Sequence, residues 1–145
     1  MQMVVGLACD HAGYALKVKV KEYLIAKGLK VNDFGTDSEE SCDYADFAHQ
    51  LAKSVSNDES TVGLAFCGSG NGINITLNRH KNVRSAYCWL TEIAVLARQH
   101  NNANICTIPA RFLTESHALE IIEAFLNADF EGGRHQKRIE KIEII

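Results

Sequence analysis

The chain has 145 residues, of which 46% are hydrophobic and 23% are charged, a length and composition typical of one globular domain with a buried core. Its formal net charge of −3 excludes the basic excess that nucleic-acid-binding domains carry, so any anion site must be local. The first residues lack the basic segment of a signal peptide, and Cys9-Asp10-His11 interrupts their apolar run too early for a membrane span. We therefore expect a single cytoplasmic domain over residues 1–145, with neither nucleic acid nor membrane as a partner.

Five short apolar runs predict β-strands, and longer segments of helical periodicity separate them. The predicted strands cover residues 3–8, 29–34, 61–66, 84–88 and 104–108. Strands that alternate with helices favour a mostly parallel sheet with right-handed crossovers. We therefore predict an α/β fold, a three-layer α/β/α sandwich with a Rossmann-like five-stranded sheet that binds ligands at the carboxyl ends of its strands.

The predicted helices follow from apolar stripes and capping residues. An apolar stripe predicts a helix after the first strand, and Gly28 marks the end of that helix. Further helices are predicted over residues 44–55, 91–100 and 114–127, with Asp43 as N-cap of the first. Two more helices are expected, one after the glycine-rich segment that follows the third strand and one at the C-terminus.

The densest chemistry lies directly after the third predicted strand, where the sequence reads Cys67-Gly68-Ser69-Gly70-Asn71-Gly72. Glycines let the backbone turn several N–H groups inward against an anion or a developing oxyanion. The G-x-G-x-G spacing, without an acidic residue at the end of the next strand and without Lys-Ser or Lys-Thr after the glycines, argues against a dinucleotide site and a P-loop. The segment therefore predicts a compact site for one small anionic group.

Cys67 is the candidate general base of this site. The alternative is an inert buried cysteine, which is common at such positions. Inward-facing N–H groups and the N-terminus of the following helix favour a thiolate, so we expect a lowered pKa for Cys67 in an accessible crevice. The five cysteines are odd in number and form no Cys-x-x-Cys pair, so we expect reduced thiols and no zinc site.

Asp10 and His11 leave the first predicted strand and should face the same crevice as Cys67, because the carboxyl ends of parallel strands share one edge of the sheet. The alternative for this pair is a helix-capping aspartate beside a solvated histidine. Convergence on the thiol favours the functional interpretation.

Two further polar groups lie in the second half of the chain. His100 ends a predicted helix, where it is either a cation stabilised by the helix dipole or a proton donor to a ring oxygen. Arg134 and Arg138 are four residues apart and share one helix face, so their guanidiniums can bind a phosphate; the alternative is a solvated basic turn. A local basic cluster in an acidic chain favours an anionic ligand.

In their order along the chain, these motifs resemble those of the ribose-5-phosphate isomerase B family, which includes isomerases of allose and galactose 6-phosphates. The resemblance spans nearly the whole chain. It rests on Cys9-Asp10-His11-Ala12-Gly13, Asp33-Phe34-Gly35-Thr36, Asp43-Tyr44, Cys67-Gly68-Ser69-Gly70-Asn71-Gly72, Arg98-Gln99-His100-Asn101 and Glu131-Gly132-Gly133-Arg134-His135.

The resemblance implies a role for each candidate residue. Cys67 matches the base that moves a proton between two sugar carbons, and His100 matches the group that helps to open the furanose ring. Ser69 offers a hydroxyl that can relay a proton between neighbouring sugar oxygens. The remaining positions match substrate contacts: Asp10 and His11 for sugar and phosphate, Gly68, Gly70, Asn71 and Gly72 for the enediolate, Asn101 for a further contact, and Arg111, Arg134 and Arg138 for the phosphate.

The resemblance further implies an aldose–ketose isomerase that interconverts ribose 5-phosphate and ribulose 5-phosphate through an enediolate, with neither metal nor cofactor. Some relatives carry Glu where this chain has Ile73, so the chain resembles the branch that uses cysteine. A homodimer with sites shared between subunits is expected, and further assembly to a tetramer stays open. The alternatives are an isomerase of a 6-phosphate hexose and a non-catalytic sugar-phosphate sensor, which would need neither Cys67 nor His100.

Overall fold

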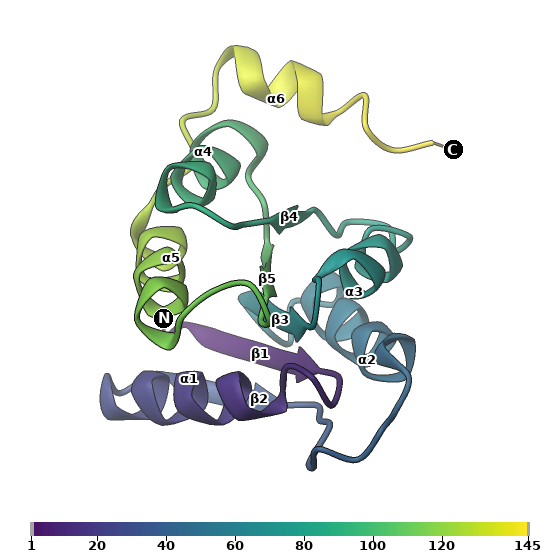
Figure 1. Ribbon diagram of the computed structural model, residues 1–145. Helices are drawn as coiled ribbons and strands as arrows, with labels where there is room; N and C mark the ends of the chain where they lie inside the picture. The colour runs from purple at the N-terminus through teal and green to yellow at the C-terminus, as the bar shows by residue number, and fades with distance from the viewer. Residues whose placement is uncertain (1, 145) are drawn as a thin grey trace.

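A computed structural model describes residues 2–144, in which one parallel sheet lies between two layers of helices (Figure 1). The strand order is β2-β1-β3-β5-β4, and each neighbouring pair is parallel. The five strands are β1 (Val4–Cys9), β2 (Lys30–Asp33), β3 (Val62–Cys67), β4 (Ser85–Tyr87) and β5 (Ile105–Pro109). The three-layer α/β/α sandwich predicted from the sequence is confirmed.

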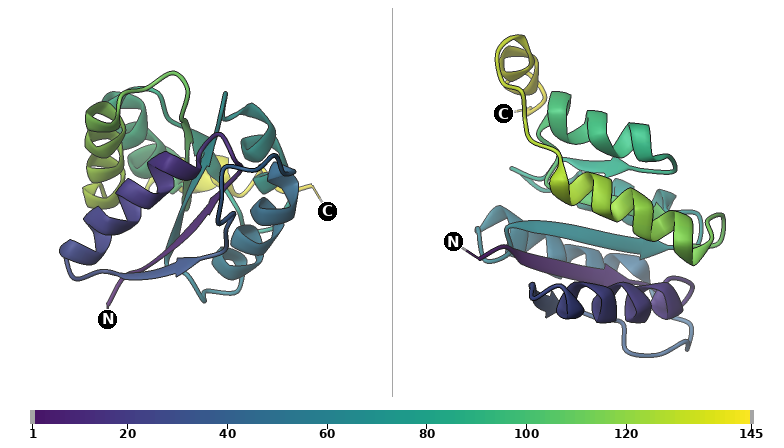
Figure 2. Two further views of the ribbon diagram at one scale, coloured as in Figure 1. Left: turned by 60° about the horizontal axis from the view of Figure 1, so that its bottom comes forward. Right: turned by 90° about the vertical axis from the view of Figure 1, so that its left-hand side faces the viewer.

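Helices cover both faces of the sheet (Figures 1 and 2). Those in the described part of the chain are α1 (Tyr14–Ala26), α2 (Tyr44–Ser56), α3 (Asn71–Leu77), α4 (Thr91–Asn101), α5 (Glu115–Asn127) and α6 (Arg134–Ile139). The apolar sides of α1, α4 and α5 form one core with Phe66 and other strand residues, and α2 and α3 form a second core around Leu51 and Ile73. The short helix α6 lies outside α4, away from the sheet (Figure 1).

The strand ends differ from the prediction in a regular way. Every strand begins one residue later than its apolar run, and the three inner strands β1, β3 and β5 also end one residue later. The edge strands β2 and β4 end one residue earlier. An inner strand has partners on both sides, so its pairing extends past the apolar run, whereas an edge strand has only one partner. Cys67 is consequently the last residue of β3, opposite Pro109 of β5.

The helix starts are set by local contacts that the sequence partly predicted. Thr114 caps α5, since its side-chain oxygen accepts the N–H of His117 at 3.1 Å. Asp43 occupies the N-cap position of α2, but its side chain makes no capping hydrogen bond. Within residues 2–144, no helix is long and apolar enough to cross a membrane.

Candidate active site

The carboxyl ends of β1 and β3 bring Asp10 and Cys67 to one edge of the sheet. Cys67 ends β3, and Asp10 directly follows β1, the strand beside it. The carboxylate of Asp10 is buried, and its Oδ1 accepts the backbone N–H groups of Ala12 at 2.9 Å and Gly13 at 3.1 Å. These two hydrogen bonds fix the turn into α1 and hold the negative charge beside the thiol. The predicted convergence of Asp10 and Cys67 is therefore present in the fold.

The Cys67 thiol is less accessible and less acidic than the sequence predicts. Its residue is only 6% exposed and belongs to the core under α2 and α3, next to Ala65 and Ile73. Burial raises the pKa of Cys67 above its usual value of 9.0, and the negative charge of Asp10 raises it further. The backbone N–H groups of Gly70 and Ile73 favour the thiolate but do not outweigh these effects. The expectation of a lowered pKa in an open crevice is wrong for the single chain.

The glycine-rich segment after Cys67 forms the turn into α3 and is flanked by two tyrosines. Gly70 has a left-handed backbone, with φ of 81°. The Tyr87 ring would lie 2.7 Å from a Cβ at Gly70, and the Tyr44 ring lies directly against Gly72. Tyr87 also donates its hydroxyl to the carbonyl oxygen of Ser69 at 2.7 Å. No role was predicted for either tyrosine, because only the fold brings their distant segments onto the glycines.

Two basic side chains lie at the same edge as the glycine-rich segment. His11 is half-buried, and its Nδ1 accepts the backbone N–H of Cys42 at 3.3 Å. Arg111 follows β5 and donates its backbone N–H to the carbonyl oxygen of Gly68 at 3.0 Å. Its guanidinium lies against Gly68, within 3.1 Å of where a Cβ would stand. The edge thus combines a thiol, a glycine-rich backbone turn and the cationic guanidinium of Arg111, as an anionic substrate requires.

The other predicted site residues lie at the opposite edge of the sheet. His100 and Asn101 end α4, which leads into the amino end of β5, and the exposed side chains of Arg134 and Arg138 belong to α6 beside it (Figure 1). Parallel strands rise about 3.3 Å per residue, so the length of β5 alone separates the two edges by more than about 10 Å. One chain therefore brings together Asp10, His11, Cys67, Gly68, Ser69, Gly70, Asn71, Gly72 and Arg111, but not His100, Asn101, Arg134 and Arg138.

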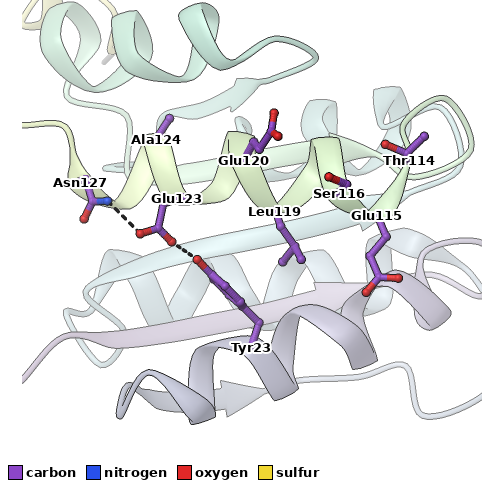
Figure 3. Close-up of a pocket in the computed structure, with 9 residues that line it drawn as sticks. All are labelled: Tyr23, Thr114, Glu115, Ser116, Leu119, Glu120, Glu123, Ala124 and Asn127. Atoms are coloured by element: carbon purple, nitrogen blue, oxygen red, sulfur yellow. Dashed lines mark hydrogen bonds between the residues drawn. The ribbon is translucent and has the colours of Figure 1, made fainter.

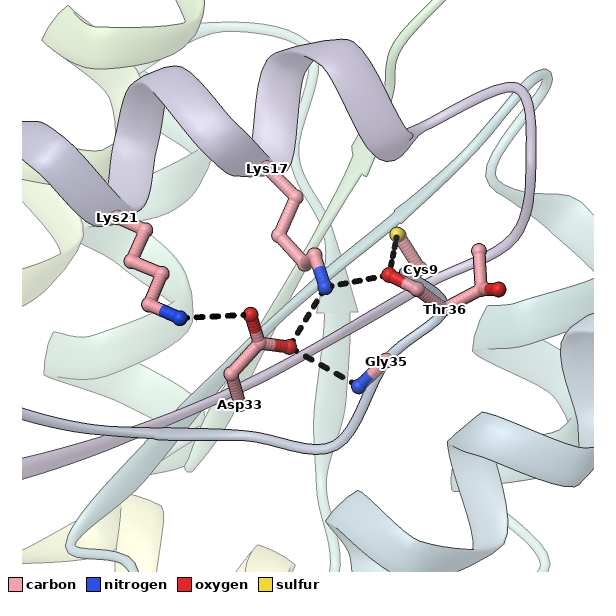
Figure 4. Close-up of polar contacts among 6 residues, drawn as sticks. All are labelled: Cys9, Lys17, Lys21, Asp33, Gly35 and Thr36. Carbon is pink, nitrogen blue, oxygen red and sulfur yellow. Dashed lines mark hydrogen bonds and ion pairs between the residues drawn. The ribbon is translucent and has the colours of Figure 1, made fainter. Parts of the chain in front are cut away.

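A buried ion pair supports the loop that follows β2 (Figure 4). Lys17 of α1 is 1% exposed, and its Nζ donates to Asp33 Oδ1 at 2.6 Å and to the Thr36 carbonyl oxygen at 2.7 Å. The same loop extends the backbone pairing of β1. The backbone N–H of Cys9 donates to the carbonyl oxygen of Gly35 at 2.8 Å, and the backbone N–H of Thr36 donates to the carbonyl oxygen of Cys9 at 3.0 Å. The network thereby fixes the residue directly before Asp10. Its signal in the sequence is the position of Lys17 on the buried stripe of α1.

A groove of about 900 Å³ between α1 and α5 lies apart from every predicted site residue (Figure 3). Tyr23 of α1 hydrogen-bonds to Glu123 of α5 across it, and Leu119 forms part of its apolar wall. Glu115 and Glu120 add further negative charge to its lining. The groove therefore lacks the cationic groups that a phosphorylated substrate needs.

Comparison with known proteins agrees with this geometry. The family described as Ribose/Galactose Isomerase matches residues 5–142 of the chain. The ribose-5-phosphate isomerase B of Escherichia coli strain K12 is 38% identical over 141 residues, covering 97% of this chain and 95% of that protein. A probable ribose-5-phosphate isomerase B of Mycoplasma genitalium is 40% identical over 144 residues, covering 98% and 95% of the two chains.

Solved structures give the same result at the level of the fold. A ribose 5-phosphate isomerase from Thermotoga maritima superposes with a TM-score of 0.97 at 43% identity and covers 100% of both chains. A ribose-5-phosphate isomerase B from Mycoplasma genitalium, solved with bound ribulose-5-phosphate, superposes with a TM-score of 0.93 at 40% identity and covers 98% of this chain and 95% of its own.

Proposed function

The chain belongs to the Ribose/Galactose Isomerase family, and from this we propose that it interconverts ribose 5-phosphate and ribulose 5-phosphate through an enediolate. The observation that carries the proposal is the position of Cys67, at the end of β3 and directly before a glycine-rich turn, with Asp10 and Arg111 at the same edge. A thiol base, backbone N–H groups and a cationic side chain are the groups that enolisation of a sugar phosphate requires.

Proton transfer is assigned to Cys67 and Ser69. In the open-chain aldose, the Cys67 thiolate removes the proton on C2, and the electron pair shifts through C1 onto the carbonyl oxygen. The thiol then returns a proton to C1, while the hydroxyl proton of O2 moves to O1 and leaves a carbonyl at C2. Ser69 is exposed two residues after Cys67, and its hydroxyl is proposed to relay that second proton. None of these steps requires a redox cofactor or a metal ion.

Charge stabilisation is assigned to the backbone and to the arginines. The glycine-rich turn presents N–H groups to the developing oxyanion, and donors placed in advance lower the barrier without reorganising. Arg111, Arg134 and Arg138 are proposed to hold the phosphate, whose binding energy orients the reacting carbons. Ring opening is assigned to His100, with Asn101 and the pair Asp10 and His11 as further contacts.

We propose that a second copy of the chain completes the site. Cys67 and His100 lie at opposite edges of one sheet, so a single chain cannot offer both to one pentose phosphate. The large apolar side chains Trp89, Leu90, Leu96 and Phe112 are 42–74% exposed, which is surface that a partner would cover. In a two-fold dimer the same patch serves both subunits, and each of the two sites takes residues from both.

A cytoplasmic location is part of the proposal. All five cysteines are free, and four of them are buried. Thiols kept in this state are typical of a reducing compartment.

The deciding experiment offers ribose 5-phosphate, allose 6-phosphate and galactose 6-phosphate in parallel to the purified protein, with EDTA present. We expect turnover of ribose 5-phosphate that falls on the order of 100-fold or more in Cys67→Ala, because removal of a catalytic base costs at least that much. Cys42→Ser is the matched control for loss of a thiol. Preference for a hexose phosphate would keep the chemistry and change the substrate. Binding of all three sugars without turnover would refute the isomerase and indicate a sensor.

A further inference from the structure

Three side chains that can bind a metal ion meet at the amino edge of the sheet. His100 comes from the end of α4, Glu131 from the segment before α6, and His135 from α6 itself. Glu131 Oε1 lies 3.9 Å from His100 Nε2 and 3.5 Å from His135 Nε2. One ligand atom from each residue lies within 4.8 Å of the other two. Side chains distant in the sequence therefore converge on one point.

The backbone holds this cluster in place. The N–H of Glu131 donates to the carbonyl oxygen of Gln99 at 3.0 Å, which fixes the segment before α6 to the end of α4. His135 is 7% exposed, and its ring stacks on that of His100 with centroids 4.2 Å apart and planes 14° from parallel. Glu131 is 52% exposed, so its carboxylate is free to move. The two imidazoles are thus held close together, the stacked rings need to tilt before both nitrogens face one ion, and the exposed carboxylate can adjust to it.

The ligand set suits a divalent transition metal. Imidazole nitrogens and a carboxylate bind Zn²⁺ at about 2.0–2.2 Å, so tetrahedral ligands lie roughly 3.3 Å from one another. The 3.5 Å between Glu131 Oε1 and His135 Nε2 is already close to that separation. A movement of the Glu131 side chain together with a tilt of the two rings would bring the other ligand atoms to the same separation. Two histidines with one carboxylate leave the fourth position of a tetrahedral zinc ion open to water.

We propose that His100, Glu131 and His135 form a binding site for a divalent transition-metal ion such as Zn²⁺, and that occupation of this site inhibits the enzyme. The inhibition rests on the proposed function, in which His100 serves ring opening. A ring nitrogen bound to a metal ion cannot also carry the proton that it must donate. The positive charges of Arg134 and Arg138 on the same short helix weaken the affinity, which suits reversible inhibition and not permanent occupancy.

Calorimetric titration of Zn²⁺ into EDTA-stripped, dialysed protein tests the site without reference to activity. We expect one ion per chain, with affinity lowered about 10-fold or more in Glu131→Gln and in His135→Gln. Glu131 is exposed, so its substitution leaves the core intact even if that of His135 does not. Equal affinity in the wild type and in Glu131→Gln and His135→Gln would refute the site.

Two pairs of neighbouring side chains of metal-ligating type supply the controls. His49 Nδ1 and His80 Nε2 are 2.7 Å apart, and Cys42 Sγ lies 4.0 Å from His11 Nδ1. We expect His49→Gln and Cys42→Ser to retain the wild-type affinity. Loss of Zn²⁺ binding in either control, with binding retained in Glu131→Gln, would show that the ion binds elsewhere and would overturn the proposal.

The isomerase assay tests the consequence of binding. Zn²⁺ should inhibit the wild type over the concentration range in which calorimetry detects binding, and inhibition of Glu131→Gln should need about 10-fold more ion. EDTA should restore the wild-type rate. Full turnover of metal-loaded protein would leave the calorimetric site standing but refute both its inhibitory effect and the role of His100. An inactive protein that still binds Zn²⁺ would refute only the proposed function.

Discussion

The environment of Cys67 sets the pH range in which this residue can act as a base. Burial is the largest cause that raises its pKa, the carboxylate of Asp10 adds to it, and the N–H groups of Gly70 and Ile73 oppose both. A base with a raised pKa is mostly protonated at neutral pH, so only a minor fraction of free enzyme carries the thiolate. In the proposed mechanism, binding of substrate must therefore supply part of the energy that ionises the thiol.

We predict that kcat/KM for ribose 5-phosphate rises with pH above neutrality and that Asp10→Asn shifts this rise to lower pH. Removal of the negative charge favours the thiolate, which lowers the pKa of Cys67. The readout is the midpoint of the alkaline rise, because loss of a substrate contact at Asp10 also lowers the absolute rate. Asp58→Asn, an exposed position with positive φ that asparagine tolerates, is the control. An unchanged or higher midpoint in Asp10→Asn would contradict the coupling.

For single residues, the sequence predicted that Cys67, the glycines and Asp10 lie together, but it did not predict what surrounds the Cys67 thiol. Cys67, the glycines and Asp10 are adjacent to strand ends, and parallel strands bring such residues together. The burial of Cys67 depends on how α3 packs over it, and the positions of Tyr44 and Tyr87 depend on segments that only the fold brings together. The spacing of these residues in the sequence predicts neither the burial of Cys67 nor the positions of the two tyrosines.

Among the elements, α1 does more than cover the sheet, because it contributes the buried cation Lys17. Burial alone would raise the pKa of Asp33, but Lys17, the Gly35 N–H and Lys21 together lower it. The folded pKa thus lies below the unfolded value, so the pair stabilises the fold above about pH 4, and this stabilisation is lost as pH falls through the folded pKa.

We predict that Lys17→Met lowers the free energy of unfolding by about 3 kcal/mol at pH 7, the cost of leaving one partner of a buried pair alone. The difference from the wild type should shrink as pH falls below about 4, because the wild type loses the stabilisation of the pair toward the lowered folded pKa of Asp33, whereas the variant has no such stabilisation to lose. Urea unfolding followed by circular dichroism measures both quantities. Lys21→Met is the matched control, since Lys21 pairs with the same carboxylate at 3.2 Å but is 42% exposed, and it should cost less than about 1 kcal/mol. A difference that persists undiminished at pH 3 would rule out the ion pair as its source.

The five strands and the three helices predicted with bounds at both ends agree with the structure to within one residue, and the misses at the carboxyl ends of the strands have one physical cause. Apolar runs report burial, whereas a strand ends where its last partner ends. Pro109 has no backbone N–H to donate, yet it is the last residue of β5, because it pairs with Cys67 of the inner strand β3. The helical pattern also predicts that Lys17 lies on the buried side of α1, but it does not identify the partner of this charge. That partner, Asp33, lies on β2 and is found only from the fold.

For the whole molecule, the topology decides how the site is built. The strand order places β3 beside β5, so Cys67 and Arg111 share the carboxyl edge. Helix α4 returns the chain to the amino edge and leaves His100 there, with α6 packed next to it. The resemblance of the sequence implied sites shared between subunits without saying which residues each subunit supplies. The fold divides them, with the thiol, the glycines, Asp10, His11 and Arg111 on one side and His100, Asn101, Arg134 and Arg138 on the other.

This division predicts that two inactive variants restore activity when they assemble together. Cys67→Ala and His100→Asn should each be inactive alone. In a mixed dimer, the intact Cys67 of one subunit meets the intact His100 of the other, so one of the two sites works. Random mixing of equal amounts in a two-fold dimer gives about a quarter of the wild-type activity. Co-expression with two affinity tags isolates the mixed dimer for assay.

The control for this experiment pairs two defects from the same edge. Co-expression of Cys67→Ala with Asp10→Asn should give no more activity than the Asp10→Asn subunits provide on their own, because Cys67 and Asp10 come from one chain and every site in the mixed dimer then lacks one of them. Restoration in both mixtures would indicate recombination or carry-over of wild-type protein. Failure of the Cys67→Ala and His100→Asn mixture, with mixed dimers demonstrated by their two tags, would mean that each subunit acts alone. His100 could not then be the group that opens the ring, because the sheet itself separates it from the base of its own chain.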